Sequence, residues 1–213
     1  METQQIKILP SLLAADYGHL ADEIRRAEAG GADALHIDIM DAHFVPNLSF
    51  GPDIVALVRR VAPGFYRHVH LMMTNPHEYI DPFVAAGAQT MQVHVEASCN
   101  VLDLIHAIRA RGVRASLAIN PETPVETLYR YIDDVEEFLV MTVHPGYGGQ
   151  SFIESCIEKI AKLRAHTGKD IMVDGGVNAE TAKRAVAAGA NMLVAGSYLF
   201  HAQDMAAAID SLR

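Results

Sequence analysis

The sequence contains very little cysteine: Cys99 and Cys156 are the only two among its 213 residues. Two cysteines are too few for a disulfide framework, and these two lack the spacing of a metal-binding pair. A structural zinc site is disfavoured as well, because such sites more often use thiolates. We expect a protein of the cytoplasm, a reducing compartment, in which both cysteines are packing residues.

Positive charge and long apolar runs are also scarce. The chain has 17 lysines and arginines against 26 aspartates and glutamates, so its net charge is −9. It therefore offers no electrostatic attraction to nucleic acid or to an anionic membrane, and an anionic ligand must be held by local groups. No apolar run reaches about 18 residues, and a polar pentad follows Met1, so we expect neither a membrane span nor a secretion signal.

What the sequence does contain is a regular alternation of short apolar runs and helix-like segments. Strand-like runs lie at 6–9, 34–39, 66–71, 90–95, 114–119, 138–143, 170–174 and 192–195, and helix-like segments lie near 17–29, 51–61, 76–86, 100–111, 123–131, 151–166, 179–188 and 203–212. Eight such units predict an α/β protein, a single-domain (β/α)8 TIM barrel over residues 1–213. An open doubly wound sheet stays the alternative.

Four polar residues close three of the predicted strands: His36, Asp38, His70 and Asp174. Side chains two residues apart on a strand share a face, so His36 and Asp38 can grip one ion. Two imidazoles with two carboxylates suit Zn²⁺, Fe²⁺, Mn²⁺ or Co²⁺ better than Mg²⁺ or Ca²⁺. The alternative is a set of hydrogen-bonded core groups, but four such groups converging in an apolar barrel would be costly without a cation.

Glycine-rich loops follow the last three predicted strands, at 144–150, 174–177 and 195–197. Backbone N–H groups of such loops can close around phosphoryl oxygens, and barrels often hold phosphate in this quadrant. None of these loops contains lysine, so neutral backbone donors would carry the binding. The predicted ligand-binding residues here are Gly146, Gly148, Gly149, Gly175, Gly176, Gly196 and Ser197.

The quoted residues belong to a longer series of ordered segments: PSLLAAD at 10–16, HIDIMD at 36–41, HFVPN at 43–47, HLM at 70–72, HVE at 94–96, NPET at 120–123, MTVHPG at 141–146, VDGGV at 173–177 and GS at 196–197. With this series the chain resembles the ribulose-phosphate 3-epimerase family over almost its whole length. The resemblance implies a ribulose-phosphate-binding type of TIM barrel and an isomerase of the pentose phosphate pathway. Small barrels commonly self-associate, so we also expect a homo-oligomer.

The resemblance further implies a role for each matching residue. His36, Asp38, His70 and Asp174 would bind one divalent metal ion, with zinc first and iron, manganese or cobalt as alternatives. Asp38 and Asp174 would remove and return the C3 proton of a ketose phosphate on opposite faces of a metal-stabilised cis-enediolate. Ser11 and His70 would contact the substrate, and Met40, Met72 and Met141 would form an apolar collar that keeps water out.

Departures from the family pattern concern the choice of substrate. His68 replaces a usual Asp, and we predict that it points away from the barrel interior; the roles of His144 and Tyr198, which also depart, stay open. The favoured substrate is D-ribulose 5-phosphate, giving D-xylulose 5-phosphate. Alternatives are a ketohexose phosphate such as D-allulose 6-phosphate, and a sugar-phosphate-binding protein without turnover.

The chain lacks the residues that other reactions of TIM-barrel enzymes need. A Schiff-base aldolase needs a buried lysine at a strand end, and none of the lysines at 7, 159, 162, 169 and 183 closes a predicted strand. Decarboxylases of the same barrel type use an Asp, Lys and Asp pattern on the second strand, whereas this chain has His36, Asp38 and Asp41. A nicotinamide-binding glycine motif is missing after the first strand.

Overall fold

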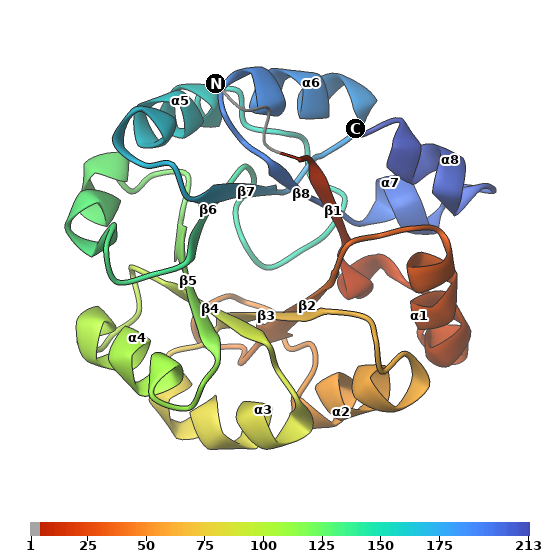
Figure 1. Ribbon diagram of the computed structural model, residues 1–213, viewed down its shortest axis with the longest axis horizontal. Helices are drawn as coiled ribbons and strands as arrows, with labels where there is room; N and C mark the ends of the chain where they lie inside the picture. The colour runs from red at the N-terminus through yellow and green to blue at the C-terminus, as the bar shows by residue number, and fades with distance from the viewer. Residues whose placement is uncertain (1–4) are drawn as a thin grey trace.

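In the computed structural model, which describes residues 5–213, eight parallel strands surround the centre of the molecule and helices cover them on the outside (Figure 1). The strands are β1 (Lys7–Pro10), β2 (Leu35–Met40), β3 (Arg67–Met72), β4 (Thr90–His94), β5 (Arg114–Ile119), β6 (Glu137–Met141), β7 (Asp170–Asp174) and β8 (Met192–Ala195). They pair in the order β1-β8-β7-β6-β5-β4-β3-β2, and a parallel bridge between Ser11 and His36 joins β1 to β2. The predicted (β/α)8 barrel is confirmed.

The helices follow the strands in turn. They are α1 (Leu20–Ala29), α2 (Pro52–Val61), α3 (Ile80–Ala86), α4 (Val101–Arg109), α5 (Cys156–His166), α6 (Ala179–Ala187), α7 (Ser197–Phe200) and α8 (Met205–Asp210), with short 3₁₀ segments η1 (Leu12–Ala14), η2 (Tyr17–His19), η3 (Pro76–Tyr79) and η4 (Val125–Tyr131). No helix within residues 5–213 is long and apolar enough to cross a lipid bilayer.

Strand alternation divides the apolar side chains into two cores. One set, which includes Ile37, Val69 and Phe138, faces outward and is buried beneath the helices. The other set, which includes Leu9, Leu139 and Met172, fills the inside of the barrel. Because both faces of each strand are buried, the strands read as nearly continuous apolar runs, and buried polar residues such as His36, Gln92 and Ser116 lie inside the barrel.

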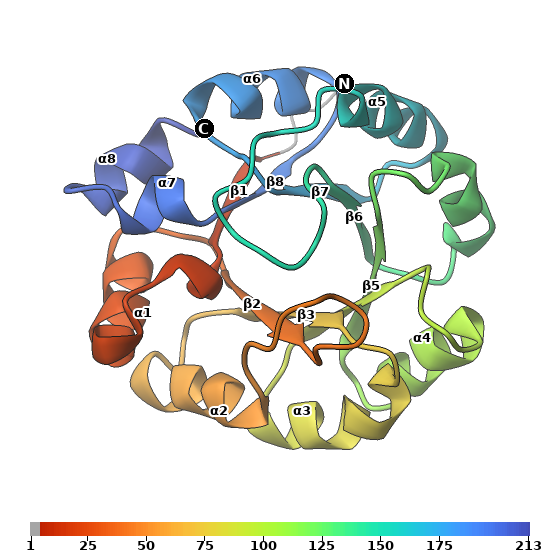
Figure 2. The same cartoon turned by 180° about the vertical axis from the view of Figure 1, so that it is seen from behind.

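Three segments differ from the sequence-based expectation. The helix expected at 123–131 is the 3₁₀ segment η4, where Thr127, Tyr129 and Tyr131 are weak helix formers. Helix α5 begins at Cys156 rather than at 151, because the chain after β6 first forms a loop over the barrel (Figure 2). The loop after β8 also forms the short helix α7, which was not expected.

The prediction that His68 points out of the barrel is wrong. His68 is completely buried inside the barrel, where its ring stacks on that of His36 with centroids 5.3 Å apart. Its Nε2 lies 2.5 Å from Glu137 Oε1. The reason is the strand period itself: residues 68 and 70 are two apart on β3, so His68 and His70 share the inward face.

Candidate active site

The four predicted metal ligands converge at the carboxyl end of the barrel, and we call them the His/Asp cluster: His36, Asp38, His70 and Asp174. The sheet register places Asp38 directly opposite His70, and Asp174 ends β7. His36 Nε2 lies 3.3 Å from Asp38 Oδ1 and 3.8 Å from Asp174 Oδ2. His70 Nδ1 lies 3.1 Å and 4.0 Å from the same two oxygens. One ligand atom of each residue lies within 4.8 Å of all the others.

These spacings fit one cation. Ligand atoms about 2.1 Å from a tetrahedrally coordinated ion lie about 3.4 Å from one another, and the four nitrogen–oxygen distances run from 3.1 to 4.0 Å. The two ring nitrogens also face each other at 3.2 Å. Burying two imidazoles and two carboxylates this close together costs free energy unless a positive charge lies between them. The cluster can therefore hold a single divalent metal ion.

The two carboxyl groups of the cluster differ in proton affinity. Burial and the negative charge of Asp38 raise the pKa of Asp174 to about 7. Burial acts in the same direction on Asp38, but His36 and His70 outweigh it and hold the pKa of Asp38 well below its usual range. Burial also lowers the pKa of His70 to about 3, so its imidazole is neutral. One carboxyl group that is readily ionised beside another that retains a proton is the pairing that acid/base catalysis needs.

Hydrogen bonds from neighbouring segments hold the Asp38 carboxyl group and the backbone at Asp174 in place. The Ser11 hydroxyl donates to Asp38 Oδ2 at 2.6 Å, which leaves Oδ1 to face the imidazoles. The backbone N–H of Thr142 donates to the carbonyl oxygen of Asp174 at 2.8 Å, and the Thr142 hydroxyl donates to that of Gly175 at 2.6 Å. The end of β7 is thus fixed against the end of β6.

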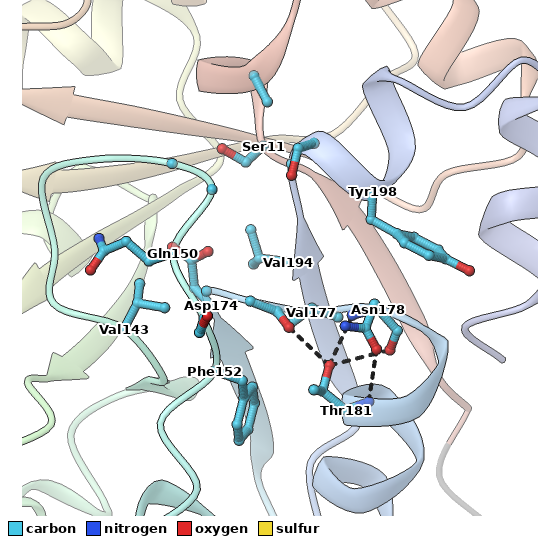
Figure 3. A pocket seen from close by; sticks show the side chains of 18 of the residues that line it. Ser11, Val143, Gln150, Phe152, Asp174, Val177, Asn178, Thr181, Val194 and Tyr198 are labelled. Carbon is cyan, nitrogen blue, oxygen red and sulfur yellow. Dashed lines mark hydrogen bonds between the residues drawn. The ribbon is translucent and has the colours of Figure 1, made fainter.

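A cavity of about 630 Å³ opens above the cluster (Figure 3). Of the predicted site residues, Ser11, Asp38, Met40, Gly148, Gly149, Asp174, Gly175, Gly176, Gly196 and Ser197 line it. Loops from β6, β7 and β8 therefore meet at one cavity wall, as the glycine pattern predicts. Asn178 caps α6 by accepting hydrogen bonds from the N–H groups of Glu180 and Thr181, so the start of this helix is fixed beside the cavity.

Five predicted site residues lie outside the described lining of this cavity: His36, His70, Met72, Met141 and Gly146. The two imidazoles are fully buried within the barrel. Met40 and Met72 pack together with Val45, whereas Met141 belongs to the apolar group inside the barrel. The methionines thus do not form one continuous collar.

Gly146 joins two loops across the barrel mouth. Its carbonyl oxygen accepts a hydrogen bond from Asn47 Nδ2 at 2.7 Å, and the Tyr147 hydroxyl donates to the carbonyl oxygen of Pro46 at 2.5 Å. Figure 2 shows the loop after β2 and the loop after β6 lying over the same end of the barrel. Gly146 therefore has a contact role between loops.

Gly176 allows a close approach between two of these loops. Its φ is +66°, and an added Cβ would lie 2.8 Å from Phe152 Cα and closer still to the Phe152 nitrogen. We expect Gly176→Ala to lower the free energy of unfolding by about 2–4 kcal/mol, because backbone strain and overpacking add. Gly148→Ala is the matched control, since its Cβ would meet nothing within 4 Å; its effect should stay within about 0.5 kcal/mol. Urea unfolding measures the free energy of unfolding of both variants. Equal values would contradict the close approach of Gly176 to Phe152.

Sequence reasoning missed several residues that surround the site. Gln150, Asn178 and Thr181 line the cavity, and His94 and Glu96 lie behind His70. The signal for the last two was present, because His94 ends a strand and Glu96 follows two residues later. The hydrogen bonds that connect them to the cluster depend on pairing between strands, which the sequence alone does not display.

The protein is a TIM barrel, and its candidate active site lies at the carboxyl ends of the strands, the face at which TIM-barrel enzymes carry their catalytic groups. Residues 7–200 match the model of the ribulose-phosphate 3 epimerase family. The chain belongs to this family, and it is an isomerase.

Similar proteins agree with this assignment. A ribulose-phosphate 3-epimerase of Bacillus subtilis is 45% identical, with 98% of each chain covered. The cytoplasmic isoform from Oryza sativa is 43% identical and covers 97% of this chain and 92% of its own. A solved mutant tryptophan synthase α-subunit from Pyrococcus furiosus superposes with a TM-score of 0.75 over 99% of this chain and 98% of its own, at 15% identity. This last likeness concerns the fold alone.

Proposed function

We propose that this protein interconverts D-ribulose 5-phosphate and D-xylulose 5-phosphate by epimerisation at C3, with one divalent metal ion, zinc first, in the His/Asp cluster. The observation that supports it most is that Asp38 and Asp174 lie in one cluster with pKa values shifted in opposite directions, in a chain of this family. Iron, manganese and cobalt are the alternative ions, because they accept the same ligands.

Inversion at a carbon atom requires a proton to leave from one face and another to arrive on the opposite face. In the proposed reaction Asp38, whose pKa is held low, removes the C3 proton, and Asp174, the carboxyl group with the higher pKa in the metal-free protein, supplies the new one. The two residues exchange roles in the reverse direction. A divalent cation in the cluster would supply a Lewis acid that stabilises the negative charge of the enediolate.

The remaining predicted site residues bind and enclose the substrate in this proposal. Ser11 lies on the cavity wall beside Asp38 and can also reach a substrate oxygen. Met40 and Met72 supply an apolar wall that does not ionise. The backbone N–H groups at Gly176, Gly196 and Ser197 would hold the phosphate, since no lysine belongs to these loops.

Incubation with each sugar phosphate in deuterated water tests the proposal. We expect deuterium at C3 of both ribulose 5-phosphate and xylulose 5-phosphate, detected by NMR, together with conversion of one into the other. Faster conversion of D-allulose 6-phosphate would assign a hexose substrate instead. Binding without exchange on any ketose phosphate would assign a sugar-phosphate-binding protein and overturn the epimerase.

Three further expectations stay predictions: the cytoplasmic location, the homo-oligomer and the organisation as one domain over 1–213. Both cysteines are free thiols, which suits the cytoplasm. Leu48 and Tyr147 are exposed large apolar side chains near the barrel mouth, where a subunit contact would cover them.

A further inference from the structure

His70 is hydrogen-bonded on the side that faces away from the His/Asp cluster. Its Nε2 lies 2.8 Å from Nε2 of His94, and the two ring planes differ by only 18°. His94 Nδ1 in turn lies 3.2 Å from Glu96 Oε2, and the backbone N–H of Asn120 donates to Glu96 Oε1 at 2.8 Å. A continuous row of hydrogen bonds therefore runs from the cluster to the end of β4.

With both rings neutral, the protons in this row have one consistent arrangement. Two ring nitrogens 2.8 Å apart share a single proton, so either His70 or His94 donates it. If His94 donated from Nε2 as a neutral ring, its Nδ1 would have no proton and would face the Glu96 carboxylate lone pair to lone pair. If His70 donates, His94 keeps its proton on Nδ1 and donates it to Glu96. An ionised Glu96 selects the second arrangement.

The surroundings of Glu96 keep it ionised. Burial alone would raise the pKa of Glu96, but hydrogen bonds from His94, Thr123 and Asn120 outweigh it and lower that pKa. Its side chain is 21% exposed, whereas His94 is almost completely buried. The Phe44 ring packs on His94 with centroids 4.9 Å apart, so water has little access to the row from that side.

We propose that His94 and Glu96 are positioning residues that fix the tautomer of His70, so that its Nδ1 presents a lone pair to the His/Asp cluster. The inference rests on the proposed metal site, which it deepens. A histidine ligand commonly donates its second N–H to a carboxylate or another acceptor, which orients the ring and makes it a better ligand. Here the acceptor of the His70 N–H is His94, and the Glu96 carboxylate acts on His70 through His94.

Glu96→Gln tests the proposal because a glutamine has only one acceptor oxygen. If that oxygen accepts from Asn120, the amide group donates to His94 Nδ1 and forces both histidines into the opposite tautomer. We expect the Kd for Zn²⁺, measured by calorimetry on chelator-treated protein, to rise about 10–100-fold, with the melting temperature nearly unchanged. This readout is independent of turnover.

Glu137→Gln is the matched control. Glu137 pairs with His68, another buried histidine of the barrel interior, and His68 meets His36 by ring stacking without a hydrogen bond among the described residues. Its Kd for Zn²⁺ should stay close to that of the unmodified protein. An equal loss in both variants would show a general effect of buried charge and would overturn the proposal.

Two further measurements separate the inference from the proposed function. His70→Ala should abolish tight Zn²⁺ binding; if it binds as tightly as the unmodified protein, the metal site itself is wrong. If His70→Ala loses the metal but Glu96→Gln does not, the metal site stands and the positioning role falls. Nitrogen NMR of the Zn²⁺-loaded, unmodified protein should show His70 protonated at Nε2 and His94 at Nδ1, and the opposite pattern overturns the inference whether or not the variants fold.

Discussion

Replacing Asp174 with Asn is expected to lower kcat for epimerisation by about 10³-fold or more. An amide can neither give up nor take up the proton that the proposed reaction returns to C3, and general acid/base catalysis alone contributes about 10²–10⁴-fold. Asn is also a weaker ligand for a divalent cation than a carboxylate, so the effects add. The measurement is the rate of conversion of ribulose 5-phosphate at saturating substrate.

Asp170→Asn is the matched control for this variant. Asp170 begins the strand that Asp174 ends, and it pairs with Lys7 at 2.7 Å at the opposite end of the barrel. The same chemical change there should leave kcat near that of the unmodified protein. The Asp174→Asn variant should still bind the sugar phosphate, because the glycine-rich loops are intact. A kcat within tenfold of the unmodified protein would remove Asp174 from the reaction.

Most of the barrel could be predicted from the sequence because one signal repeats eight times. The runs that form β5, β7 and β8 were predicted with the observed bounds, since each is short, apolar and followed by loop residues. The same period places His36 and Asp38 on one face. The outward prediction for His68 applies the alternation wrongly, because residues 68 and 70 are two apart on β3 and share the inward face.

The parts that could not be predicted depend on contacts between distant segments. The hydrogen bond of Thr142 with Gly175 and that of Asn47 with Gly146 join loops from different βα units. Their existence follows from the register of the sheet and the path of each loop, neither of which is readable from local composition. The separation of Met141 from Met40 and Met72 has the same origin, since β6 pairs with neither β2 nor β3.

Removal of the metal ion is expected to lower kcat by about 10³-fold, and Zn²⁺, Mn²⁺, Co²⁺ or Fe²⁺ should restore it. The reason is that a Lewis acid at the cluster contributes several kcal/mol, and about 1.4 kcal/mol corresponds to tenfold in rate. Exhaustive dialysis against a chelator followed by titration of each ion provides the measurement. Mg²⁺ is the control, because it binds weakly to sites with imidazole ligands. Full activity of metal-free protein would contradict the proposed site.

The affinity of the cluster for the metal ion should also increase as the pH rises towards 7. Asp174 has its pKa raised to about 7 in the metal-free protein, so below pH 7 an incoming cation must displace its proton. Asp38 also outweighs burial to raise the pKa of His36, which adds a second proton. His70, with a pKa of about 3, adds none. Affinity should therefore rise by about tenfold per pH unit for each displaced proton as the pH increases towards 7.

The contribution of Asp174 to the stability of the metal-free protein should decrease as the pH rises. Because the folded pKa of Asp174 exceeds its unfolded value near 3.8, its contribution is complete below that value and is lost as the pH rises through about 7. The gain in melting temperature on adding Zn²⁺ should therefore grow between pH 5 and pH 7.5 in the unmodified protein. Asp174→Asn carries no such proton, so its gain should be smaller and less dependent on pH. A pH-independent gain in the unmodified protein would show that Asp174 does not meet the ion.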